Sequence, residues 1–103
     1  MEVRTTTKGR ALTVSLFGEL DHHAARETTT AIERALDAAL PSALAVDFGG
    51  VTFMDSSGIA VAMRATRRMA ALGGRSSLIN VPPQAKRVFD AAGILCAPKE
   101  ETR

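Results

Sequence analysis

Residues 43–59 read ALAVDFGGVTFMDSSGI, an apolar run that ends in two hydroxyl side chains and then continues at helical spacing. Ala43 to Phe48 is typical of a short buried strand, and the apolar residues from Ile59 onward are typical of a helix. We therefore expect a corner at Ser56 between a strand and a helix. A serine there has two ordinary uses: it caps the helix by accepting a hydrogen bond from a free backbone N–H, or it is exposed where such N–H groups would hold a phosphate.

The size and composition indicate one globular domain in a reducing compartment. A chain of 103 residues has room for a single domain, and 46% apolar with 23% charged residues argues for a packed core. No apolar run approaches the roughly 20 residues that cross a bilayer, and residues 1–7 lack the apolar stretch of a signal peptide. The single cysteine, Cys96, cannot form an internal disulfide and fits a structural thiol. We expect a cytoplasmic protein with no membrane partner.

The charge pattern argues against direct nucleic-acid binding. The net charge is only +2, the aromatic residues are four phenylalanines, and the basic residues are spread along the chain. Binding to nucleic acid would require a broader basic stripe with stacking aromatics. Arg64, Arg67 and Arg68 form the one local cluster, which we expect on the solvated side of the helix that starts at Ser57. The expected buried face of that helix consists of Ile59, Met63, Thr66 and Ala70.

Strand patterns alternate with helix patterns along the chain. We expect strands over residues 2–6, 11–17, 43–48 and 77–81, helices over 25–39, 57–72 and 84–91, and a last short strand at 94–96. Asp21 is the expected N-cap or first-turn acid of the first helix. Gly49-Gly50 and Gly73-Gly74 are interpreted as turns. The order β-β-α-β-α-β-α(-β) predicts an α/β fold, with a small mixed sheet and helices packed against it.

The candidate catalytic and metal-binding groups do not assemble a familiar site. His22 and His23 are adjacent, so on a helix they would point about 100° apart, and no cysteine or carboxylate stands at a zinc spacing. A hydrolase with Ser56 as nucleophile would need a Gly-x-Ser-x-Gly elbow, but Met54 stands at the first glycine position. One of the two histidines could still approach Ser56 as a base, which leaves this alternative open.

Other chemistries find less support. An aspartyl-phosphate receiver at Asp47 would need an acidic pair for magnesium and a lysine after a later strand, where Pro82-Pro83 stands instead. The glycine pairs form neither a dinucleotide fingerprint nor a phosphate loop. We expect no metal, no cofactor and no catalytic residue.

Four segments, in order and at their spacing, closely resemble the bacterial anti-sigma factor antagonists of the STAS domain family. They are GELDHHA at 18–24, DF at 47–48, FMDSSGI at 53–59 and KRVFDAAGI at 86–94. The Asp-Ser-Ser-Gly corner is the most specific of them. The GELDHH segment is similar to the sporulation-type branch of the family.

The resemblance implies a binding module rather than an enzyme. Such proteins bind an anti-sigma factor that is also a serine kinase, and so free a sigma factor. The kinase then phosphorylates the first serine of the corner, here Ser56, and a serine phosphatase removes the phosphate. The residues that the resemblance implies for partner binding are Asp21, His22, His23, Asp55, Ser57, Gly58 and Ile59.

Two other roles stay open, together with one structural consequence. The chain could be a STAS module of a signalling, lipid-transport or ligand-binding assembly, or an enzyme with Ser56 as nucleophile. Family members usually continue past Ile94 into a strand and a helix, whereas residues 97–103 are a poor helix and are expected to form a flexible tail. One sheet face would then be partly uncovered, favouring weak homo-oligomers or an exposed apolar patch. A shortened piece of a longer protein explains the early end equally well.

Overall fold

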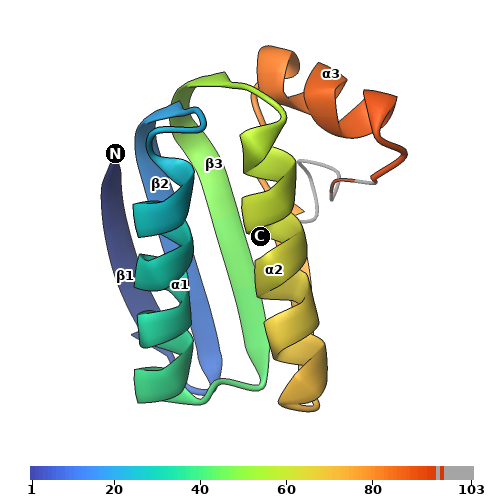
Figure 1. The fold of residues 1–103 in the computed structure, drawn as a ribbon. Coiled ribbons are helices and arrows are strands. Elements are labelled where there is room, and N and C mark those ends of the chain that lie inside the picture. Colours follow the sequence, from blue (N-terminus) through green and yellow to red (C-terminus); the bar gives the residue numbers. More distant parts are fainter. Residues whose placement is uncertain (95, 97–103) are drawn as a thin grey trace.

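A computed structural model describes residues 1–94 and 96. The elements in chain order are β1 (Glu2–Lys8), β2 (Ala11–Leu20), α1 (Ala25–Ala39), β3 (Ala43–Met54), α2 (Ser57–Ala71), β4 (Arg75–Ile79) and α3 (Pro83–Ala91) (Figure 1). The order β-β-α-β-α-β-α confirms the predicted α/β fold. In the described residues, no helix has the length and apolar character that crossing a bilayer requires.

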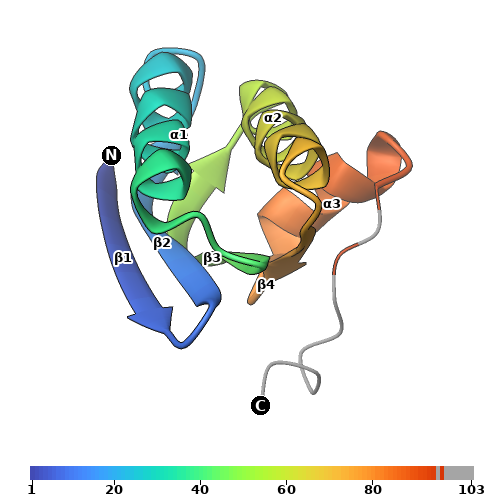
Figure 2. The same ribbon diagram turned by 90° about the horizontal axis from the view of Figure 1, so that it is seen from below.

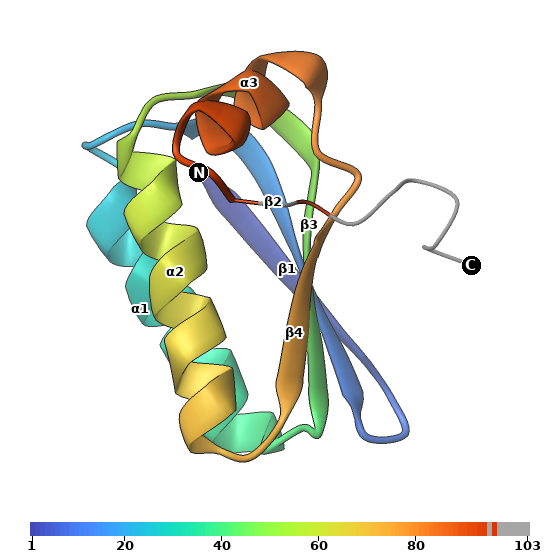
Figure 3. The same cartoon turned by 90° about the vertical axis from the view of Figure 1, so that its right-hand side faces the viewer.

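The four strands form one mixed sheet in the order β1-β2-β3-β4. β1 pairs with β2 antiparallel, whereas β2 with β3 and β3 with β4 are parallel pairs. Parallel neighbours are joined by crossovers of one hand, and both crossovers here step in the same direction across the sheet. This places α1 and α2 side by side on the same face (Figures 2 and 3).

The core lies between this face of the sheet and the two helices. Alternate residues of β2 and β3 are buried, among them Leu12, Val14, Leu16, Leu44, Val46 and Phe48. Ile32 and Leu36 of α1 pack against them. Phe48 and Phe89 meet edge to face with ring centroids 5.4 Å apart, which joins α3 to the sheet. The opposite face of β2 and β3 carries partly exposed side chains that are mostly small or polar, including Thr13, Ser15, Ala45 and Asp47.

Three strands run further than predicted, and β1 is the first of them, because it reaches Lys8 instead of residue 6. β2 continues past Phe17 to Leu20, and β3 continues through Gly49-Gly50 to Met54, so this glycine pair is not a turn. The pairing of β2 with β3 continues across the glycine pair with an irregular register, which shifts between Ser15 and Phe17 and between Gly18 and Glu19. A Cβ at Gly50 would lie 2.2 Å from Cδ2 of Phe17, so glycine is needed there for the strands to approach.

The predicted position of β4 was two residues too far along the chain. The strand covers Arg75–Ile79, whereas the prediction was 77–81. The predicted buried face of α2 was wrong. The buried residues of that helix are Gly58, Val61, Ala62, Ala65 and Met69, instead of Ile59, Met63, Thr66 and Ala70. This face lies one residue back along the chain, about 100° around the helix. Its small side chains let the helix approach the sheet closely.

Two of the three clustered arginines are not simply solvated. Arg64 Nε lies 2.9 Å from Glu33 Oε2, and Arg68 pairs with both Glu33 and Asp37, so these contacts tie α2 to α1. Arg67 is exposed as predicted. The expected strand at 94–96 includes residue 95, which lies outside the described residues, and neither Ile94 nor Cys96 is in a strand. The expected tail at 97–103 also lies outside them.

Candidate phosphorylation and partner-binding site

The carboxyl ends of β2 and β3 bring two of the expected site residues to one edge of the sheet. Leu20 and Met54 are register partners, and the Asp55 N–H donates to the Leu20 carbonyl at 3.3 Å. Asp21 and Asp55 therefore leave adjacent parallel strands at the same edge. Asp21 leads into α1 and Asp55 leads into α2, so the two helix entries form one acidic corner.

Asp55, and not Ser56, caps α2. Its Oδ1 accepts a hydrogen bond from the Ser57 N–H at 2.8 Å, and its carbonyl accepts one from the Gly58 N–H at 3.0 Å. Ser56 occupies the N-cap position with φ −65° and ψ −14°, and its side chain makes no cap hydrogen bond. The capping interpretation of Ser56 was therefore wrong, because this helical conformation differs from the extended one that a capping side chain requires. Ser56 is exposed, and its hydroxyl makes no hydrogen bond that caps the helix.

Asp21 plays a related part in the turn before α1, so the prediction that it is the N-cap or first-turn acid of that helix was wrong. Its Oδ1 accepts hydrogen bonds from the N–H groups of His23 at 3.0 Å and Ala24 at 3.1 Å. The N-cap residue of α1 is Ala24, so Asp21 caps the turn that precedes the helix rather than the helix itself. The bond from the Ala24 N–H, followed by that from His23, holds the pKa of Asp21 below its ordinary value.

The two histidines lie in the turn before α1. Both are exposed, with ring centroids 4.0 Å apart, and His23 Nδ1 lies 3.8 Å from Asp21 Oδ2. In the described structure no hydrogen bond joins either histidine to Ser56, so the arrangement of base and nucleophile that a hydrolase needs is not assembled there. Within residues 1–94 and 96, no three or more His, Cys, Asp or Glu side chains gather as a metal site.

Gln84 completes the corner, and sequence reasoning missed it. Its Oε1 accepts a hydrogen bond from the Met54 N–H at 2.9 Å, and its Nε2 donates to the Met54 carbonyl at 2.8 Å. Because β4 is paired only as far as Asp47 of β3, the end of β3 has no strand partner on that side. The amide of Gln84 takes the place of such a partner. A glutamine in the first turn of a helix carries no sequence signal for this role.

Gly58 and Ile59 have different surroundings. Gly58 is buried, and a Cβ there would lie 2.4 Å from Cγ and Sδ of Met54, so glycine lets α2 start close to the sheet. Ile59 is partly exposed. Together with Ser56 it borders a shallow groove of about 650 Å³ between the start of α2 and α3, which Figure 1 shows beside each other. The groove is lined by Ser56, Ile59, Gln84, Arg87, Val88, Ala91 and Ala92.

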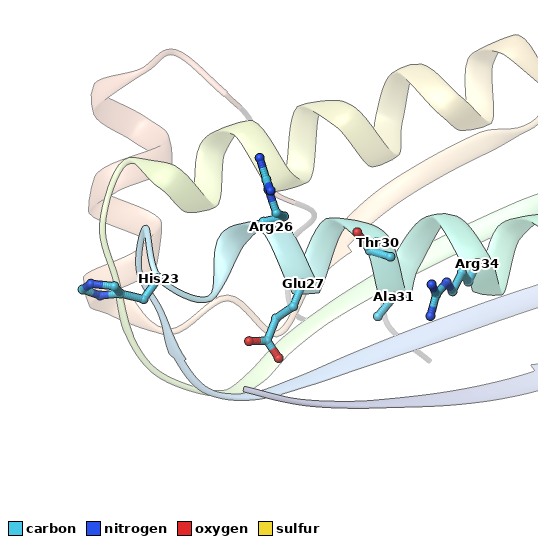
Figure 4. Close-up of a pocket in the computed structure, with 6 residues that line it drawn as sticks. All are labelled: His23, Arg26, Glu27, Thr30, Ala31 and Arg34. Carbon is cyan, nitrogen blue, oxygen red and sulfur yellow. The ribbon is translucent and has the colours of Figure 1, made fainter.

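A second hollow lies on the outer face of α1, and the charged side chains that line it do not all point toward one place. Its volume is about 500 Å³, and it is lined by His23, Arg26, Glu27, Thr30, Ala31 and Arg34 (Figure 4). Figure 4 shows Arg26 and Glu27 pointing in opposite directions. The corner around Ser56, with its exposed hydroxyl and two neighbouring carboxylates, is the stronger functional site.

Comparison with known proteins places the chain in a family. The family model described as STAS domain matches residues 2–101, which include all seven elements. The chain belongs to the STAS domain family. This confirms the resemblance stated from the four sequence segments.

The relatives of this STAS domain include anti-sigma factor antagonists. It is 35% identical over 81 residues to the anti-sigma F factor antagonist of Lysinibacillus sphaericus. The aligned segment covers 79% of this chain and 69% of that protein. The solved structure of the anti-sigma factor antagonist SpoIIAA in its unphosphorylated form has a TM-score of 0.78 at 30% identity, covering 97% of this chain and 91% of that one. The structure of the Bacillus cell fate determinant SpoIIAA in the phosphorylated form has a TM-score of 0.71, also at 30% identity, covering 97% and 95%.

Proposed function

We propose that this STAS domain is an anti-sigma factor antagonist controlled by phosphorylation of Ser56. In its unphosphorylated form it binds an anti-sigma factor that is also a serine kinase, and so releases a sigma factor in the cytoplasm. Phosphorylation ends this binding, and a serine phosphatase restores it. The observation that carries the proposal is the exposed Ser56 side chain, which makes no cap hydrogen bond in a corner where Asp55 caps the helix.

The corner suits a kinase substrate because its backbone is fixed while its hydroxyl is accessible. Met54 is paired with Leu20 on one side and bound by the Gln84 amide on the other. Ser56 follows two residues later. A kinase would therefore meet the serine at a defined position, without having to unfold a helix to reach it.

The charge of the corner explains why the modification would end binding without unfolding the domain. A phosphoserine adds about 1.5 to 2 negative charges at neutral pH. Asp21 and Asp55 already place two carboxylates at this edge, so an acidic or tightly fitting partner surface would be repelled. The side chain of Ser56 is exposed, so the phosphate displaces no buried group.

The proposed partner surface surrounds Ser56. It comprises Asp21, His22, His23, Asp55, Ser57 and Ile59. Gly58 acts indirectly, because its missing side chain allows α2 to begin against Met54. The relatives are regulatory proteins by name. We infer a binding role for this surface and no turnover of a substrate.

The deciding experiment combines a cognate serine kinase and ATP with site mapping. We expect a single phosphate on the wild-type protein, none on Ser56→Ala, and one on the control Ser42→Ala, which removes an exposed serine outside the proposed partner surface. Calorimetry should then show that Ser56→Asp binds the kinase at least tenfold more weakly with an unchanged melting temperature. A phosphate on Ser57 instead, or equal affinity of Ser56→Asp, would contradict the proposal.

A further inference from the structure

The start of α2 offers a phosphate fewer free N–H groups than a helix N-terminus usually does. The N–H of Ser57 donates to Asp55 Oδ1 at 2.8 Å, that of Gly58 to the Asp55 carbonyl at 3.0 Å, and that of Ile59 to the Ser56 carbonyl at 3.1 Å. Helices bind anions through N–H groups that lack such partners. In this conformation these three N–H groups are therefore not free to hold a phosphate, so a cationic side chain beside Ser56 is the next candidate to hold it.

Arg87 of α3 is a cationic residue that lies along the same groove as Ser56. No other residue that the structure places along this groove is cationic. Within residues 1–94 and 96, no carboxylate forms an ion pair with Arg87. The neighbouring Lys86 differs, because its Nζ lies 3.0 Å from Asp90 Oδ2.

The helix that carries Arg87 is anchored beside the corner. Gln84 lies three residues earlier on α3 and is bound to the Met54 backbone through both ends of its amide. Residues three apart on a helix lie on the same side. Gln84 therefore orients this side of α3 toward the corner, and Arg87 follows one turn later along the groove.

We propose that Arg87 binds the phosphate of phosphorylated Ser56 and holds it in the groove between α2 and α3. The inference rests on the proposed function, since it assigns the intramolecular partner of that phosphate. A guanidinium presents a planar fork of donors that matches two phosphate oxygens, and it offsets the repulsion from Asp21 and Asp55. The bound phosphate then covers part of the groove that Ile59 and Val88 line.

The test uses full-length protein into which phosphoserine is incorporated at position 56 during synthesis, so it requires no kinase. The readout is the second pKa of the phosphoserine, followed by ³¹P NMR. A nearby cation favours the dianion, so Arg87→Gln should raise this pKa by about 0.5 unit or more from its wild-type value. Arg87→Lys should restore part of the difference. The matched control Arg67→Gln removes an exposed arginine from α2 and should leave the pKa unchanged.

Equal titration of wild type, Arg87→Gln and Arg67→Gln would overturn the assignment of Arg87. That result is distinguishable from failure of the proposed function, which would appear as a kinase that modifies another residue or binds the phosphorylated protein unchanged. A second readout checks the NMR result. Phosphorylation should lower the melting temperature of Arg87→Gln relative to that of the wild type, because the variant leaves the phosphate beside Asp21 and Asp55 without a cation. An equal change in both proteins would overturn the inference.

Discussion

At the residue scale, the acidic corner makes stability depend on pH through Asp21. Hydrogen bonds from the Ala24 and His23 N–H groups lower the pKa of its carboxyl from 3.8. A carboxyl with a lowered folded-state pKa contributes stability that is present above its unfolded pKa and is lost as the pH falls through the folded value. Asp21→Asn should therefore be less stable than wild type at neutral pH, and the difference should shrink below pH 3.8. Urea unfolding at several pH values measures this, and a difference independent of pH would contradict it.

Gly58 allows a second test at the same scale. A Cβ at this position would lie 2.4 Å from the buried Met54 side chain and 3.2 Å from Leu20 Cδ2. Overpacking of this kind costs about 1–3 kcal/mol, more than the gain in helix propensity from alanine. We expect Gly58→Ala to lower the free energy of unfolding by up to about 2 kcal/mol net, which is an overpacking cost of up to about 3 less a helix-propensity gain of about 1. The control Ala60→Ser adds an atom at an exposed position of the same helix. Equal stability of the two variants would show that the site relaxes freely.

The residues of the site were only partly predictable from sequence. The pattern located a strand-to-helix corner at Ser56 and an acid at Asp21 before the first helix, whereas the expected site roles of Asp55 and Ser56 came from the resemblance to the STAS family. The pattern could not tell which side chain caps the helix, since that depends on the backbone angles of Ser56. It also could not find Gln84 or Arg87. Their contribution depends on α3 lying beside the corner, which is a tertiary arrangement of segments about 30 residues apart.

At the scale of elements, Gln84 joins α3 to the unpaired end of β3. Gln84→Ala would leave the part-buried N–H and carbonyl of Met54 without this partner, at a cost of about 1–3 kcal/mol. Gln84→Glu keeps an acceptor for the N–H but places an oxygen against the carbonyl, so it should restore little. Hydrogen exchange offers a direct readout: the Met54 amide should lose protection in Gln84→Ala, while that of Val46 in the same strand keeps it. Full protection of Met54 in the variant would contradict this role.

The elements themselves were predictable in order but less so in extent. Hydrophobic periodicity located every strand and helix that the structure describes up to Ala91. The glycines misled the prediction at Gly49-Gly50, because glycine serves both turns and close strand contacts, and only the position of Phe17 distinguishes the two. The face of α2 was misplaced for a related reason. Small residues such as Gly58 and Ala65 are buried by close approach to the sheet, and a scale of hydrophobicity ranks them below Ile59 and Met63.

At the scale of the whole molecule, the topology gathers the site at one end. β2 and β3 are parallel, so their carboxyl ends and the helices that follow them share an edge, and α3 lies at that same edge (Figure 3). The opposite end carries the β1–β2 turn at Gly9 and the turn at Gly73 between α2 and β4. The core between them is packed by buried residues from the sheet, α1 and α2. Within residues 1–94 and 96, a packed core therefore separates a change in charge at one end from the opposite end.

This arrangement predicts a local response to phosphorylation of Ser56. Amide chemical shifts should change in residues 21–24, 54–60 and 84–88, which belong to the corner and the groove, and remain constant around Gly9 and Gly73. Hydrogen-exchange protection of the buried strand residues, such as Val14 and Val46, should be equal in the two forms, because the phosphate adds charge at the surface and removes no packing. Heteronuclear NMR of the unmodified and phosphorylated proteins checks both expectations. Shift changes that extend to Gly9 and Gly73, or weaker protection in the strands, would mean that the switch works by loosening the fold rather than by changing one surface.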